Sequence, residues 1–301
     1  MNPKTALFNW FLLMCLVALW GTSFLFTAIS VESVDPIAVV FFRVLIAAVI
    51  LTMVVIIKGH KFPREKSSWL AFMLMGFAGN AFPFFLITWG QLSVNSGIAG
   101  MIMAIMPLMT MLLAHYFVEG ENLNRYKIIG FIFGITGITI LLGPVFEGGG
   151  RAVFGGIAIF IAATSYAVNS ILVKRLPRFS PMVGAAGVMI SASILILPMW
   201  LIQTTASFDQ LSLRSIYSVI WLGIGPTAIA TMILFAVIER AGPTFLSTIN
   251  YMIPVVAFFA GAYILSEPVS WSSIVALVII LAGIALTRFR ANQAVVTKTS
   301  G

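Results

Sequence analysis

Long apolar runs separated by short polar loops dominate the chain from residue 7 to residue 287. Each run is close to the roughly 20 apolar residues that an α-helix needs to cross a bilayer. The pattern predicts ten spans, at 7–30, 37–57, 69–90, 98–118, 128–145, 152–173, 182–202, 216–238, 244–265 and 271–287. Strands of a membrane barrel would alternate apolar and polar positions, and these runs do not. We therefore expect an all-α membrane protein with ten transmembrane helices.

The composition supports the same class. Hydrophobic residues make up 60% of the 301 residues and charged residues only 9%, against about 25% charged in soluble domains. A soluble fold of this composition would expose large apolar patches. The single cysteine, Cys15, excludes an intramolecular disulfide. We find no metal or cofactor motif, and we expect the protein to need neither.

Positive charges alternate between successive loops. If the N-terminus is cytoplasmic, the cytoplasmic segments hold most of the 17 Lys and Arg residues. These are Lys4, Lys58, Lys61, Arg64, Lys66, Arg125, Lys127, Lys174, Arg175, Arg178, Arg240, Arg288, Arg290 and Lys298. The other loops hold only Arg151 and Arg214. Because short cytoplasmic loops are enriched in Lys and Arg, we expect both termini in the cytoplasm, and the basic balance needs no nucleic-acid partner.

The two halves of the chain resemble each other at a spacing of 147 residues. Gly76, Ala81, Ile102, Pro107 and Tyr116 recur as Gly223, Ala228, Ile249, Pro254 and Tyr263. After a gap of one residue, Glu121 matches Glu267 and Gly137 matches Gly283. Halves with an odd number of spans insert in opposite directions, as in many alternating-access carriers. We expect two inverted five-helix repeats, 1–147 and 148–301, although two hydrophobic halves can also resemble each other by composition.

A series of short motifs resembles a known family. The series is Trp20-Gly21-Thr22-Ser23-Phe24, Asp35-Pro36, Arg43, Pro107, Gly120-Glu121-Asn122-Leu123, Gly130 and Gly137-Ile138, with a weaker second copy that includes Ser165-Tyr166-Ala167, Pro254, Glu267-Pro268-Val269 and Gly283. Together they resemble the EamA-type branch of the drug/metabolite transporter superfamily, and in detail the bacterial aromatic amino-acid exporters of the YddG kind. The resemblance implies an inner-membrane exporter with a central cavity between the halves. Tyr166 stands where that pattern has Trp, and Ser266 where it has Gly.

Polar residues inside spans predict the lining of that cavity, because polar groups in lipid are costly. Asn80, Phe84 and Thr88 share one helical face of the third span, and Thr227 and Thr231 share the equivalent face of the eighth. The full predicted substrate-binding set is Trp20, Ser23, Asn80, Phe84, Thr88, Met101, Tyr166, Asn169, Thr227, Thr231, Asn250 and Tyr251. The alternative is that these groups only bond between helices.

Three further features have structural alternatives. Pro107 and Pro254 interrupt the fourth and ninth spans and either free carbonyls for a ligand or only kink the helix. Arg43, inside the second span, either pairs with Asp35 or a helix C-terminus to shape an outer gate, or extends outward to the membrane surface. The small residues Gly130 and Gly134 pack the fifth span against the tenth or form a dimer, and we expect a monomer.

No paired charges are available inside the spans to hold both ends of an amino acid. The predicted substrate is a small neutral metabolite, first an aromatic or bulky neutral amino acid, exported through a largely uncharged cavity. Efflux of a nucleobase or cationic drug is the alternative. No selectivity-filter repeat favours a channel, and no catalytic motif favours an enzyme. Because no Asp or Glu lies in mid-span, proton coupling has no support.

Overall fold

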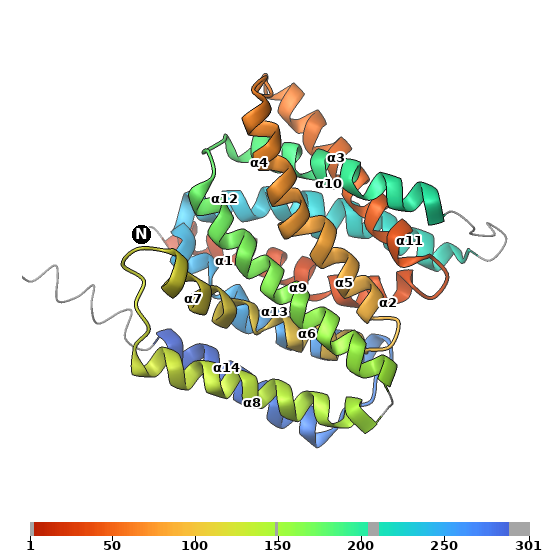
Figure 1. Cartoon of the computed structure of the whole chain (residues 1–301), viewed down its shortest axis with the longest axis vertical. Coiled ribbons are helices and arrows are strands. Elements are labelled where there is room, and N and C mark those ends of the chain that lie inside the picture. Colours follow the sequence, from red (N-terminus) through yellow and green to blue (C-terminus); the bar gives the residue numbers. More distant parts are fainter. Residues whose placement is uncertain (1–2, 148–149, 204–210, 289–301) are drawn as a thin grey trace, which may run out of the picture.

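The computed structural model describes residues 3–147, 150–203 and 211–288, where every regular element is a helix (Figure 1). The first half forms α1 (Pro3–Gly21), α2 (Ser23–Ser30), α3 (Pro36–Ile57), α4 (Lys66–Gly76), η1 (Phe77–Ala81), α5 (Phe82–Gly90), α6 (Ser96–Met103), α7 (Met106–Phe117) and α8 (Arg125–Glu147). The second half forms α9 (Gly150–Arg175), α10 (Pro181–Gln203), α11 (Leu213–Leu222), η3 (Gly223–Ile229), α12 (Ala230–Leu246), α13 (Ile249–Ile264) and α14 (Trp271–Arg288).

Within the described ranges, eight helices are long and apolar enough to cross a membrane. Two shorter apolar helices, Ile249–Ile264 and Trp271–Thr287, complete the predicted set. The ninth crossing begins before α13, because Gly242 kinks α12 with a φ of 82° and Pro243 starts a new helical turn. Glycine suits this kink, since no Cβ opposes a positive φ. Residues 243–264 are then long enough to cross, and the predicted all-α fold of ten helices is confirmed.

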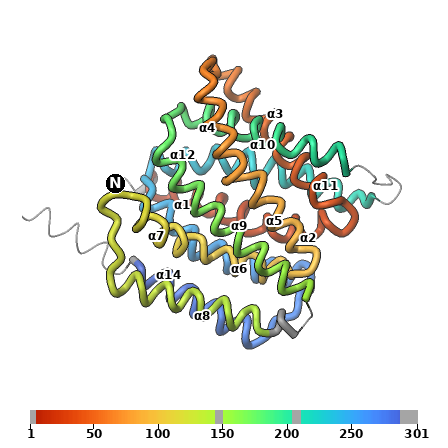
Figure 2. The backbone as a smooth tube through the Cα atoms, in the orientation of Figure 1, coloured from red at the N-terminus to blue at the C-terminus, as the bar shows by residue number. Residues whose placement is uncertain are grey.

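The main packing contacts between crossings are reciprocal between the two halves. The second crossing, α3, lies along the seventh, α10, and the fifth, α8, lies along the tenth, α14. The third crossing packs on the sixth through α5 and α9, and the eighth packs on the first through α11, α12, α1 and α2. The tube in Figure 2 shows α8 and α14 side by side. This reciprocal pattern is that of two inverted repeats related by a pseudo-two-fold axis.

Glycines bring α8 and α14 into backbone contact. A Cβ built on Gly130 would lie 2.5 Å from the carbonyl oxygen of Gly283, and one on Gly283 would lie 2.7 Å from that of Gly130. The contact has a counterpart, because a Cβ on Gly137 would lie 3.0 Å from the carbonyl oxygen of Ala276. Gly137 is the repeat equivalent of Gly283, and Gly130 that of Ala276. Of the two expected uses of Gly130, the structure supports packing of the fifth crossing against the tenth within one chain, whereas the space that a Cβ on Gly134 would enter is filled by Leu108 of α7.

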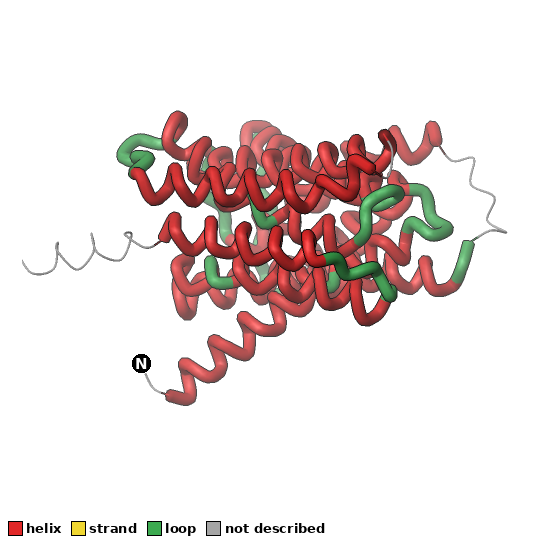
Figure 3. Tube along the Cα trace, turned by 90° about the horizontal axis from the view of Figure 1, so that it is seen from below, coloured by secondary structure: helices red, strands yellow, loops and turns green. Residues whose placement is uncertain are grey.

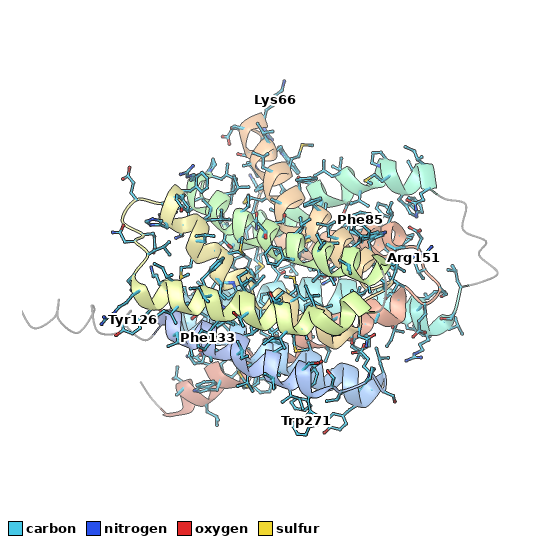
Figure 4. The ribbon with its side chains drawn as sticks, turned by 60° about the horizontal axis from the view of Figure 1, so that its bottom comes forward. Lys66, Phe85, Tyr126, Phe133, Arg151 and Trp271 are labelled. Atoms are coloured by element: carbon cyan, nitrogen blue, oxygen red, sulfur yellow. The ribbon has the colours of Figure 1, made fainter. Side chains whose placement is uncertain are left out.

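The bundle has two chemically different ends. The helix α1 starts and α14 finishes at the same end, on the left of Figure 3. The loops 58–65, 118–124 and 176–180 lie at this basic end, with most of the Lys and Arg residues. Tyr126 lies there in Figure 4, whereas Arg151 and Trp271 lie toward the opposite end. Arg290 and Lys298, two of the predicted cytoplasmic charges, are outside the described residues.

Candidate substrate-binding site

Crossings three and eight are widened at the same place by a π-helical segment. The segments η1 and η3 cover 77–81 and 223–229, and a shift of 147 residues places η1 inside η3. Such segments are rare and are frequent at functional sites. Inside η3, Pro226 has no N–H, and the Thr227 hydroxyl donates to the Leu222 carbonyl at 2.8 Å. Both halves therefore place irregular backbone inside a crossing, where it must find partners within the protein.

Side chains from the opposite half bond to both π segments. The indole Nε1 of Trp20 donates to the Pro226 carbonyl at 3.0 Å, and the hydroxyl of Ser165 donates to the Ala78 carbonyl at 2.7 Å. Ser165 precedes Tyr166, which is the repeat equivalent of Trp20. The first crossing of each half thus holds the widened crossing of the other half, which places Trp20 at the junction between the repeats.

The most unusual group in the interior is the guanidinium of Arg43. Its Nε donates to the Thr227 hydroxyl at 3.0 Å, and its central carbon lies 3.8 Å from the centroid of the Phe84 ring. The residue is only 6% exposed. A cation over an aromatic face gains roughly 0.5–2 kcal/mol. Arg43 therefore joins two residues from the predicted site, one from each half.

This placement corrects the predicted role of Arg43. Asp35 instead caps α3, where its Oδ1 accepts from the Ile37 N–H at 2.8 Å, and its Oδ2 accepts from Gln203 Nε2 at 3.2 Å. Both pairing with Asp35 and extension to the membrane surface are therefore wrong for Arg43. The reason is the close approach of α3 to η3, because a Cβ on Gly223 would lie 3.1 Å from the Arg43 carbonyl oxygen. Thr227 is thereby within reach of the guanidinium.

Tyr166 and Asn169 approach the same region from α9. The ring of Tyr166 lies edge-on to that of Phe84, with 6.4 Å between centroids. Asn169 follows on the same helical face, against η1, where a Cβ on Gly79 would lie 2.4 Å from its Nδ2. The Oδ1 of Asn169 is buried and has no hydrogen-bond partner. An unpaired buried amide oxygen is costly, so this group calls for a functional explanation.

The other predicted binding residues fall into three groups. Thr88 and Met101 are 1% and 0% exposed, so both are buried in this conformation, and their contact with a substrate stays a prediction. Ser23 and Thr231 donate to carbonyls of their own crossings, at Trp20 and Thr227. The half-exposed residues are Asn80, Asn250 and Tyr251. Tyr251 donates to the Ile284 carbonyl at 3.3 Å, in the packing between α13 and α14.

The two predicted helix breaks differ. Pro107 follows a true interruption, because α6 ends at Met103 and α7 begins at Met106. Pro254 lies inside α13, and the interruption falls earlier, between α12 and α13. The repeat is nevertheless visible in the backbone: the N–H groups of Ala104 and Tyr251, at equivalent positions, each donate three residues back instead of four. A prolyl nitrogen has no hydrogen, so both interruptions leave carbonyls without helical partners.

A carboxylate ties two crossings together at the end opposite the basic end. Glu267, after α13, accepts from the N–H groups of Ser96 and Gly97 at 2.7 and 2.9 Å, at the start of α6. A carboxylate at a helix N-terminus pairs with free N–H groups and with the helix dipole. Gly261 makes room for it, because a Cβ there would lie 2.2 Å from Oε2. We call this arrangement the Glu267 cap.

A protein-family model described as the EamA-like transporter family matches the chain twice, over residues 8–143 and 153–289. The chain belongs to the EamA-like transporter family. Both matches lie within the two halves related by packing. As an EamA protein, it is a multi-pass membrane protein that transports a small molecule.

Named relatives of this EamA protein agree with that class. It is 26% identical over 281 residues to the uncharacterized inner membrane transporter YedA of Escherichia coli, covering 91% of this chain and 88% of the relative. It is 25% identical over 288 residues to a probable amino-acid metabolite efflux pump of Salmonella typhimurium, covering 93% and 94%. A solved crystal structure superimposes with a TM-score of 0.69 at 22% identity, covering 94% of this chain and 97% of that chain, which supports the fold.

Sequence reasoning missed two contacts of this EamA protein. The inward direction of Arg43 depends on the register of α3 against η3, which no local pattern encodes. The Glu267 cap had a signal, because Glu121 and Glu267 match between the repeats, but the match does not say which N–H groups the carboxylate reaches. Both contacts join the two halves.

Proposed function

We propose that this EamA transporter exports small neutral metabolites, first of all aromatic or bulky neutral amino acids. The main support is the junction between the repeats, where Trp20, Phe84 and Tyr166 supply aromatic surface. Arg43 and Thr227 add hydrogen-bonding groups beside it. Binding sites for small molecules combine apolar and aromatic surface with a few placed polar groups. The relative named as a probable amino-acid metabolite efflux pump supports the same substrate class.

The proposed mechanism is alternating access. Residues 1–147 and 148–301 act as the two repeats of one transport unit and rock about the junction that Trp20 and Ser165 form. We place both termini in the cytoplasm of a bacterial cell, in its inner membrane, because the basic end carries most of the Lys and Arg residues. We propose a monomer without obligatory proton coupling.

A cationic drug is the weaker candidate substrate. The interior cation of Arg43 would repel it, and the described residues pair this guanidinium with no carboxylate. A nucleobase would find aromatic surface but would not need the guanidinium. The position of Arg43 therefore favours an amino acid over the alternatives.

Counterflow in proteoliposomes tests the proposal. Purified full-length protein would be reconstituted with labelled phenylalanine, tryptophan, leucine, alanine, adenine and a quaternary ammonium dye. We expect saturable counterflow for phenylalanine, tryptophan and leucine, and background rates for the dye. The Trp20→Ala variant should lower the rate at least roughly tenfold, since it removes both aromatic surface and the bond to η3. Uptake of the dye alone, or linear uptake without counterflow, would contradict an amino-acid carrier.

A further inference from the structure

The guanidinium of Arg43 is buried without a counter-ion among the described residues. Thr227 accepts from Nε, and the Phe84 ring covers one face. The described residues offer no hydrogen bond to either Nη atom, yet neither Nη is among the fully buried unpaired atoms. The end of the guanidinium that carries both Nη atoms is therefore unpaired and still accessible. Arginine cannot lose its proton in a protein, so burial leaves a full charge that calls for an anion.

The unpaired end of the guanidinium has a defined geometry. Two parallel N–H groups at the end of a planar guanidinium match the two oxygens of a carboxylate. Contacts with Thr227 and Phe84 hold the plane in place. Tyr166 lies beside Phe84, with 6.4 Å between the ring centroids, and its hydroxyl has no hydrogen-bond partner among the described residues. The contacts with Thr227 and Phe84 thus orient the fork, and the Tyr166 hydroxyl is a further donor in the same cluster of residues.

Asn169 supplies the opposite chemistry on the same face of α9. It lies one helical turn after Tyr166, a spacing that brings Cβ atoms to about 5–6 Å. Its buried Oδ1 accepts no hydrogen bond. The amide of Asn169 packs against Gly79 of η1, where an added Cβ would lie 2.4 Å from Nδ2. A hydrogen-bond donor such as an ammonium group would satisfy this oxygen.

From these observations we propose that Arg43 binds the carboxylate of the transported molecule and that Asn169 accepts from its ammonium group. The inference rests on the proposed transport function and narrows its substrate class to zwitterionic α-amino acids. Phe84 lies beside Arg43, and Tyr166 lies beside Phe84, so both rings would contact an apolar side chain of the substrate. The two polar ends of an amino acid are then matched without a carboxylate in the protein.

Binding of four matched compounds to the detergent-purified full chain tests the assignment. L-Phenylalanine carries both charged groups, L-phenylalaninamide lacks the carboxylate, 3-phenylpropionate lacks the ammonium, and 3-phenylpropionamide lacks both. Apparent affinities come from the dose-dependent rise in melting temperature. We expect phenylalanine to bind at least roughly tenfold more tightly than either compound that lacks one charged group, as bidentate charged hydrogen bonds do.

Variants then assign each preference to its residue. Arg43→Gln should abolish the preference for phenylalanine over its amide, and Arg43→Lys should keep part of it, because a lysine retains charge but loses the fork. Asn169→Leu should abolish the preference for phenylalanine over 3-phenylpropionate and leave the other preference intact. Arg64→Gln is the matched control, since Arg64 is exposed in the loop before α4.

Several results would overturn the assignment. A role of Arg43 in folding alone would lower the melting temperature of Arg43→Gln without changing the ratio between phenylalanine and its amide. If Arg43→Gln does not fold, equal affinity of the wild type for carboxylates and amides would refute the site. Transport failure is distinguishable: if 3-phenylpropionate binds through Arg43 while no amino acid is transported, the proposed function fails and the carboxylate site stands.

Discussion

The two ends of the bundle carry the same motif in different states. At the end opposite the basic end, the Glu267 cap ties the loop after α13 to the start of α6. At the basic end its repeat equivalent, Glu121, pairs instead with Lys127 at 3.7 Å, and its side chain is 45% exposed. Pro243 and Thr244, the equivalents of Ser96 and Gly97, are exposed, whereas Ser96 and Gly97 are buried. The carboxylate therefore joins two crossings at the opposite end but not at the basic end, where hydrogen bonds of Arg175 to the Phe117 carbonyl and of Arg240 to Asn9 connect the halves instead.

Two residues explain why the basic end lacks this cap. Pro243 has no N–H, so the equivalent of the Ser96 bond cannot form. Ala114 stands where Gly261 makes room for the carboxylate, and its Cβ would occupy that space. The difference is therefore built into the sequence as well as into this conformation. Two related repeats can therefore keep the same fold although only one of them forms the carboxylate contact of the Glu267 cap.

The largest effect should follow removal of the carboxylate. Glu267→Ala leaves two N–H groups at the start of α6 without their partner, and we expect a loss of about 2–3 kcal/mol in the free energy of unfolding. Glu121→Ala is the matched control and should change it by less than about 0.5 kcal/mol, since exposed ion pairs contribute little. Unfolding by SDS titration of the detergent-purified protein measures both. Equal losses in the two variants would remove the distinction between the ends.

A smaller effect should follow from filling the space beside the carboxylate. In Gly261→Ala the new Cβ would lie 2.2 Å from Oε2 of Glu267, so the carboxylate must move away. The expected loss is about 1–2 kcal/mol, because the weakened cap is partly offset by the better helix propensity of alanine. Hydrogen exchange of the Ser96 and Gly97 amides should accelerate. Gly184→Ala is the control, since its Cβ would approach no closer than 3.5 Å to Phe179; unchanged exchange in Gly261→Ala would contradict the account.

The smallest effect concerns the residue before each glutamate. Ser266 has a φ of 55°, and its equivalent Gly120 has a φ of 83°. A left-handed conformation costs a residue with a Cβ roughly 1 kcal/mol. Ser266→Gly should therefore stabilise the protein by less than about 1 kcal/mol, and Gly120→Ser should destabilise it by a similar amount. Both are measured in the same SDS titration, and a loss of stability in Ser266→Gly would show that the serine side chain has another role.

Hydropathy and charge predicted the ten crossings because burial in lipid requires long apolar helices, and the repeat predicted which crossings are equivalent. The directions of side chains were harder to predict from the sequence. The prediction that Asn80 and Thr88 share a face assumed one regular helix, whereas Asn80 lies in the π-helical segment η1 and Thr88 lies in α5, where it is buried. The direction of Arg43 depends on distant Gly223 and Thr227, so it is a property of packing. Tyr166 and Trp20 could be predicted because a polar aromatic residue inside a crossing favours an interior position, whatever the packing register of the helix.

The contact between α8 and α14 also bears on how such a chain can arise. Gly130 meets Gly283 as Ala276 meets Gly137, so each surface faces a copy of itself, as in an isologous dimer interface. A chain of five helices with this surface could associate with a second copy inserted the other way. Joining the two copies in one gene fixes their ratio and lets each diverge. Pro243 at one end and Gly261 at the other can then differ from their equivalents in the first half. In a homodimer of identical chains, every substitution would appear in both copies.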